Sequence, residues 1–138
     1  MASITLRGRE IPLIYTVYEM KEAQAEICPL GELPYRILGQ NRDDQKDMSR
    51  FGSAEHIDTV AKMIRIMGNG GLEEAGETPD LTDKWVMRSL RPKQVADMVN
   101  ACITALNEGM ASEIKDDEKK GPVDVTLENM NKKKEKES

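Results

Sequence analysis

The chain has 138 residues, enough for one domain with its own core, and a formal net charge of −5. This acidic balance gives no overall electrostatic footprint for binding nucleic acid or an anionic membrane. We find no signal peptide and no apolar run of about 18 residues or more. The two cysteines, Cys28 and Cys102, are far apart, so the sequence predicts a soluble cytoplasmic protein with reduced thiols.

Residues 3–15 alternate apolar and polar side chains on both sides of a Gly8-Arg9 connection, which predicts a short β-hairpin. The apolar positions are Ile4, Leu6, Ile11, Leu13 and Tyr15. Pro12 restricts the second strand to an edge position or an early end, because proline cannot donate to a ladder. A two-stranded hairpin is marginal in water, so we expect it to lie on helices or to pair with another copy.

Thr16 and Glu19 fit a capping box, which predicts a helix that starts there and ends before Pro29. The side of this helix expected to face inward carries Val17, Met20, Ala23 or Gln24, and Ile27. Residues 30–38 are apolar but interrupted by glycine and proline, and they predict a short packed helix or turn. Residues 40–50 are strongly polar and fit either a short exposed helix or a mobile loop.

Ser53 is a good N-cap for the next helix. Its inner face is predicted to hold Ile57, Val60, Ala61, Ile64 and Met67, broadened by Met63 and Ile66. Because glycine is a poor helix former, the run from Gly68 to Gly71 predicts the end of this helix. An acidic loop follows at residues 72–80. Thr82 then caps a helix over 83–90, with Leu81 and Val86 placed as a hydrophobic staple.

The longest amphipathic pattern starts at Pro92, a residue suited to the first turn of a helix. Its apolar arc contains Val95, Met98, Val99, Cys102, Ile103, Leu106 and Met110. This arc is wider than a coiled-coil seam, so we expect the helix to contact more than one neighbour. Gly109 lies on the same side, where it either lets another backbone approach closely or ends the helix. Because Met110 keeps the apolar period, we favour the close approach.

From residue 116 the composition changes, since thirteen of the last 23 residues are Asp, Glu or Lys. Such a segment cannot bury enough apolar surface to offset the entropy of ordering it. The sequence therefore predicts one helical domain over 1–115 and a charged, disordered tail over 116–138. The expected fold class is mostly α (α+β), a small helical domain with a short N-terminal β-hairpin.

No residue pattern indicates catalysis, a cofactor or a metal site. The single histidine, His56, lies in the first turn of a predicted helix. The glycine run at 68–71 lacks the Lys-Ser/Thr of a phosphate-binding loop and follows a helix rather than a strand. The adjacent carboxylates Asp43-Asp44 and Glu73-Glu74 fall on predicted loops, and nothing places them across a cleft. We therefore interpret the chain as a non-enzymatic protein.

A helix over 81–90, a break at Arg91-Pro92 and a second helix have the order of a helix-turn-helix, which keeps a DNA-binding regulator as an alternative. The second helix would have to enter the major groove with its N-terminal residues. Its leading charges are Arg91 and Lys93, followed by Asp97. Because phosphate contacts dominate DNA affinity, these cations are too few to favour that function.

The order of features resembles the tail assembly chaperones of long-tailed phages and prophages of Gram-positive bacteria. The resemblance covers residues 2 to about 114. The segments that carry it are Ile4-Thr-Leu-Arg-Gly-Arg-Glu-Ile-Pro-Leu13, the helix ending in Gly68-Asn-Gly-Gly71, Pro79-Asp-Leu-Thr82, Leu90-Arg-Pro-Lys-Gln-Val95 and Ala105-Leu-Asn-Glu-Gly-Met110. It is a pattern of elements rather than a catalytic signature, and it transfers no active-site residue.

The resemblance implies a small, mostly helical protein of the bacterial host cytoplasm. Such a protein binds the long, helix-rich tape measure protein, keeps it soluble and promotes assembly of tail tube protein around it. Self-association is left open, and a structural adaptor of the finished virion is a further alternative. Methionine is adaptable and suits surfaces that must fit irregular partners. The partner-binding residues we expect are Met63, Ile66, Met98 and Met110.

Overall fold

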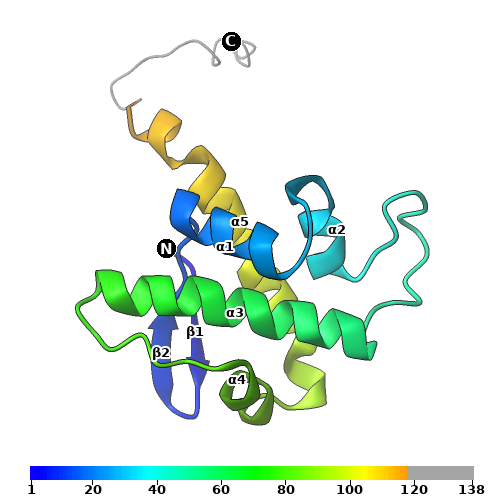
Figure 1. Ribbon diagram of the computed structural model, residues 1–138, viewed down its shortest axis with the longest axis horizontal. Helices are drawn as coiled ribbons and strands as arrows, with labels where there is room; N and C mark the ends of the chain where they lie inside the picture. Colours follow the sequence, from blue (N-terminus) through cyan, green and yellow to red (C-terminus); the bar gives the residue numbers. More distant parts are fainter. Residues whose placement is uncertain (118–138) are drawn as a thin grey trace.

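The computed structural model describes the backbone of residues 1–117 and the side chains of residues 1–111. A β-hairpin is followed by helices, as the sequence predicts (Figure 1). The elements are β1 (Ser3–Leu6), β2 (Arg9–Pro12), α1 (Val17–Glu26), η1 (Leu30–Glu32), α2 (Leu33–Leu38), α3 (Ala54–Glu74), α4 (Asp83–Ser89), η2 (Pro92–Gln94) and α5 (Val95–Asp117). Helix α3 lies across the middle of the molecule and contacts β2, α1, α2, α4 and α5. The fold class is therefore mostly α with an N-terminal hairpin.

The hairpin turns at Arg7 and Gly8, one residue earlier than the expected connection. Both residues have positive φ, 53° and 78°, as a tight two-residue turn between antiparallel strands requires. In the resulting register Ile4 pairs with Ile11, and both side chains are buried together with Leu6. Strand β2 ends at Pro12, which confirms the restriction expected from proline.

Helix α1 begins with the predicted capping box, in which Thr16 and Glu19 satisfy each other's backbone donors. Its inward side is centred on Glu19 and Ala23 rather than on Val17, which is exposed. The expected inward position of Val17 is therefore wrong. On a helix Val17 lies about 120° from Ala23, so the rotation that buries Glu19 beside α3 turns Val17 outward.

Helix α3 starts at the predicted N-cap, since the Ser53 hydroxyl accepts the His56 amide. It does not end at Gly68, however, and it continues through the glycines to Glu74. A Cβ at Gly71 would come within 3.0 Å of the Pro12 carbonyl oxygen, and one at Gly68 would meet Leu81. The hairpin thus lies directly on the helix backbone, and the Ile14 amide donates to the Met67 carbonyl at 3.3 Å. This packing overrides the low helix propensity of glycine.

The elements between α1 and α3 anchor a polar loop. Leu33 and Ile37 of α2 are fully buried, as expected for a packed short helix. Residues 40–52 form turns instead of the alternative exposed helix. Asn41 and Asp47 accept backbone amides two residues ahead, the local bonding by which Asn and Asp favour turns.

Helix α4 has the predicted cap at Thr82, and Leu81 and Val86 are both buried as the expected staple pair. Its Asp83 carboxylate pairs with Arg65 and Lys62 of α3, and Arg65 also pairs with Glu26 of α1. These ion pairs connect the three helices at one side of the molecule.

Helix α5 follows a single 3-10 turn that contains Pro92, and it runs to Asp117. Most of the predicted arc is confirmed, because Met98, Val99, Cys102 and Leu106 are buried. Gly109 faces Tyr15 so closely that a Cβ would fall within 3.0 Å of the Tyr15 carbonyl oxygen. The expected close backbone approach at Gly109 is therefore confirmed.

The charged tail falls almost entirely outside the described residues, because its first two residues belong to α5 and residues 118–138 are not described. The prediction of disorder in the tail stays a prediction. Within the described range, no helix is both long and apolar enough to span a bilayer.

Both cysteines are buried and free, and the thiol of Cys102 should make the protein sensitive to alkaline pH. Burial raises the pKa of Cys102 to about 12 from an ordinary value of 9.0. The unfolded chain therefore releases this proton first, so the free energy of unfolding should fall as pH rises above about 9. We expect a loss of about 2 kcal/mol by about pH 10.5, measured by urea denaturation.

A Cys102→Val variant removes the thiol and keeps an apolar side chain of similar size. Its stability should decline less steeply over the same pH interval, because only the remaining titrating groups contribute. An identical decline in the two proteins would contradict the assignment to Cys102.

Candidate functional site

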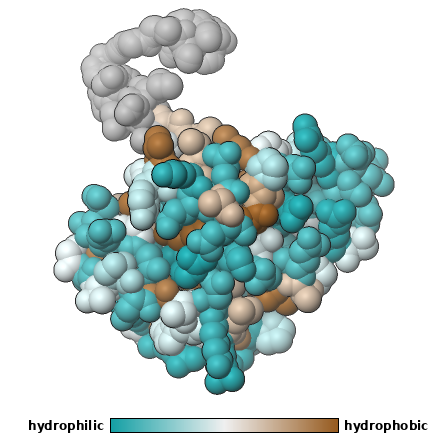
Figure 2. Space-filling model, viewed as in Figure 1, coloured by the Kyte–Doolittle hydropathy of each residue, from teal (hydrophilic) through white to brown (hydrophobic). Residues whose placement is uncertain are grey.

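A groove of about 970 Å³ lies between α5, the segment after β2 and the start of α1. Ile14, Val17 and Met20 line one side, and Gly109 and Met110 line the other. Figure 2 shows brown atoms over α5 beside α1, whereas most of the same face is teal. We call this depression the methionine groove.

Local sequence signals build the two walls of the methionine groove. The capping box at Thr16 turns the chain sharply from the hairpin segment into α1. Gly109 brings the backbone of α5 against Tyr15 and so sets the distance between the walls. At the rim, Glu108 accepts the Ala2 amide at 2.9 Å and thereby links α5 to the start of β1.

The side chains that face this groove suit apolar contacts. Val17 is 74% exposed and Met110 is 65% exposed, high values for such large apolar side chains. Among the lining side chains, Glu108 and Tyr15 are the titratable ones. The pKa of Tyr15 is raised by burial, and its hydroxyl has no hydrogen-bond partner among the described residues. The lining therefore favours binding of an apolar segment over acid–base chemistry.

The structure places the four expected partner-binding residues in different environments. Met63 and Ile66 on α3 and Met98 on α5 are buried in the core. They are unavailable as surface residues in this fold, because α3 is covered by five elements and Met98 lies where α5 packs on its neighbours. Met110 is exposed and reaches the methionine groove.

Val17, Ile14 and Met20 line the groove but were not predicted as partner-binding residues. Val17 occupies the first position after the cap, where no neighbouring turn determines which way a side chain faces. The signal in the sequence was the capping box, since it turns Glu19, two positions after Val17, back toward the N-cap.

His56 has a structural environment. Its Nδ1 accepts the Gly52 amide at 2.9 Å, and its Nε2 lies 2.8 Å from the Ile37 carbonyl oxygen. A carbonyl oxygen only accepts, so Nε2 carries the proton. The ring also packs against Phe51 at a centroid distance of 4.8 Å. His56 thus holds the loop over 40–52 against α2 and α3.

The other candidate groups stay apart. Asp43, Asp44, Glu73 and Glu74 are all exposed on the surface. No group of three or more potential metal-ligating side chains occurs among the described residues. Helices α4 and α5 follow one another as the helix-turn-helix alternative expects, but the first residue of α5, Val95, is partly buried against the core.

Comparisons of the chain with models of protein families, with curated proteins and with solved structures find no match.

Proposed function

We propose that this protein is a phage tail assembly chaperone that binds the tape measure protein in the methionine groove. Binding keeps the long partner soluble while tail tube protein assembles around it. The observation that carries the proposal is the pair of highly exposed apolar residues, Val17 and Met110, on opposite walls of one large groove.

The shape and composition of the methionine groove support a helical partner. Amphipathic helices bind by laying one apolar side into a groove, with anchors spaced about one turn apart. Methionine side chains adapt to irregular partner surfaces, and Met20 and Met110 both line this groove. A tape measure protein, being long and helix-rich, offers many such apolar faces.

We expect that Val17→Asp or Met110→Asp will abolish co-purification with a co-expressed tape measure protein and leave that partner in the insoluble fraction. Both changes place a charge in the apolar groove, where its desolvation opposes binding. The matched control is Tyr18→Asp. Tyr18 is the neighbouring exposed residue on α1 and does not line the groove. An acid is favourable at a helix N-terminus, so Val17→Asp and Tyr18→Asp should both fold.

Three outcomes would count against this proposal. If Val17→Asp and the wild type recover equal amounts of the tape measure protein, the groove is not its binding site. If ultracentrifugation shows a wild-type dimer that Val17→Asp dissociates, the groove binds a second copy instead. Detection of the chain in purified virions would favour the alternative of a structural adaptor.

A further inference from the structure

A second apolar cleft lies at a different place in the fold and is independent of the methionine groove. It has a volume of about 280 Å³ and is formed by α3, the residues just before α3, and the connection from α4 to α5. Its lining includes Ile57, Leu90 and Val95, and its rim includes Phe51 and Met87. Phe51 is 39% exposed and Met87 is 38% exposed, so large apolar surface is open to solvent here.

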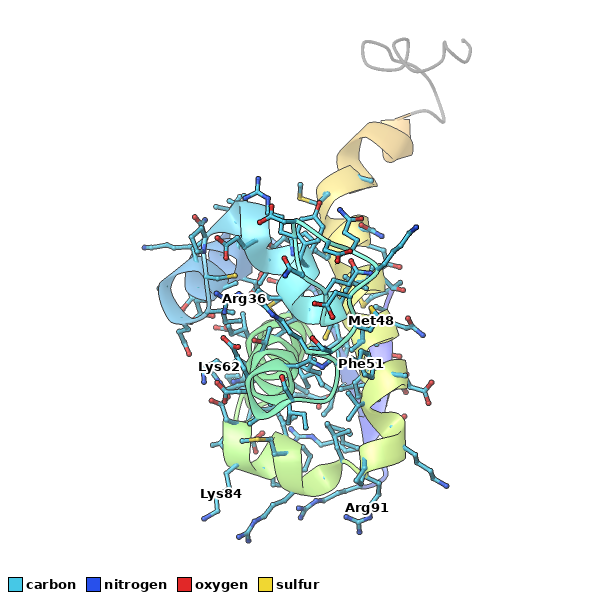
Figure 3. All side chains as sticks on the ribbon, turned by 90° about the vertical axis from the view of Figure 1, so that its right-hand side faces the viewer. Arg36, Met48, Phe51, Lys62, Lys84 and Arg91 are labelled. Atoms are coloured by element: carbon cyan, nitrogen blue, oxygen red, sulfur yellow. The ribbon has the colours of Figure 1, made fainter. Side chains whose placement is uncertain are left out.

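Cations gather beside this second cleft. Arg91 is part of its lining. On α4, Lys84 lies three residues before Met87 and Arg88 lies one residue after it. The three side chains therefore share one side of the helix. Lys93 follows Pro92, another lining residue. Figure 3 shows Arg91 at the lower edge of the molecule below Phe51, and Lys84 farther away at the lower left.

Four of the other cations that the structure describes are held in ion pairs, whereas these four are not. Arg9, Arg36, Lys62 and Arg65 each pair with a carboxylate. By contrast, Lys84, Arg88, Arg91 and Lys93 form no ion pair with any side chain of residues 1–111. No Asp or Glu occurs between Lys84 and Asp97 in the sequence. A segment with four cations and no carboxylate therefore borders one side of an apolar cleft, on a chain whose net charge is −5.

We propose that the second cleft binds an acidic amphipathic segment of a partner protein. A large apolar side chain of this segment enters between Phe51 and Met87, and its flanking carboxylates pair with Arg88, Arg91 and Lys93. The cleft is concave and apolar at its centre, which suits a side-chain anchor surrounded by charged contacts. This proposal goes beyond the tape measure protein and does not depend on it.

A protein segment fits this site better than nucleic acid. Phosphate binding would use the cations but would leave the apolar cleft unoccupied. Base stacking needs a freely accessible aromatic face, whereas the Phe51 ring packs against His56. A segment with alternating apolar and acidic positions uses both parts of the site.

The test titrates a fluorescein-labelled acidic peptide into the full-length protein and follows fluorescence anisotropy. In this helical peptide a tryptophan and a leucine lie one turn apart, and glutamates occupy the neighbouring positions. We expect binding that weakens as salt rises, because the paired charges lie at the rim. Arg88→Glu combined with Arg91→Glu should weaken binding about tenfold or more. Met87→Ser should also weaken it, through the lost apolar contact.

Lys21→Glu is the matched control, because Lys21 is an exposed cation on α1, away from this cleft. This variant should bind the peptide as the wild type does. Val17→Asp, which alters the methionine groove, should also bind the peptide normally, and this result would distinguish the two sites. The proposal is overturned if the Arg88/Arg91 variant binds equally well, or if a peptide with lysines in place of glutamates binds as tightly. Binding of duplex DNA, but not of the acidic peptide, would show a nucleic-acid site instead.

Discussion

Replacing Gly71 with alanine should destabilise the protein by about 3–5 kcal/mol, although alanine is the better helix former. In an exposed helix this change would stabilise by about 1 kcal/mol. Here the added Cβ meets the carbonyl of Pro12, and both clashing groups belong to backbones that neighbouring elements hold in place. To relieve this clash the hairpin must move away from α3, and that movement exposes buried residues such as Ile11 and Leu13.

Urea denaturation followed by circular dichroism measures this loss. Gly31→Ala is the control, because no atom lies within 4 Å of a Cβ at Gly31 and its φ is not positive. Its stability should stay within about 0.5 kcal/mol of the wild type. A Gly71→Ala protein as stable as the wild type would mean that the hairpin does not rest on the backbone of α3.

The same glycine illustrates where sequence interpretation failed. Gly68, Gly70 and Gly71 have the local pattern of a helix end, and every signal within a few residues agrees with that. What keeps the helix intact is contact with residues far away in the chain, namely Pro12, Glu19 and Leu81. A hydrophobic pattern describes one element at a time, so it contains no information about which distant segment packs on a glycine.

Helix starts were predictable because their causes are local. Thr16, Ser53 and Thr82 each accept an amide two or three residues ahead, and the sequence alone places both groups. The hairpin was predictable for a similar reason, since its two strands are joined by a two-residue turn. The fold class follows from these elements.

The candidate site was only partly predictable, because exposure depends on how far the neighbouring elements extend. The apolar arc of α5 contains both Met98 and Met110, and periodicity treats them alike. Met98 lies where other helices cover α5, whereas Met110 lies beyond them and borders the methionine groove. Since three segments form this groove, no single stretch of sequence reveals it.

Replacing Gly109 with alanine should impair the methionine groove more than the fold. The added Cβ would meet the Tyr15 carbonyl, as at Gly71, but the clash falls near the end of the packed part of α5. That end of the helix can shift outward while Cys102 and Leu106 stay buried, so we expect a stability loss of about 1–3 kcal/mol. The shift would separate Met110 from Val17 and change the width of the groove.

We therefore expect Gly109→Ala to remain folded by circular dichroism and to lose co-purification with the tape measure protein. Thr104→Ala is the control, since Thr104 is exposed on α5 and does not line the groove. It should retain both stability and binding. If Gly109→Ala folds and binds the partner as the wild type does, the spacing of the two walls is irrelevant to binding. The partner would then have to contact a different surface, because a groove set by one glycine cannot keep its shape when that glycine gains a side chain.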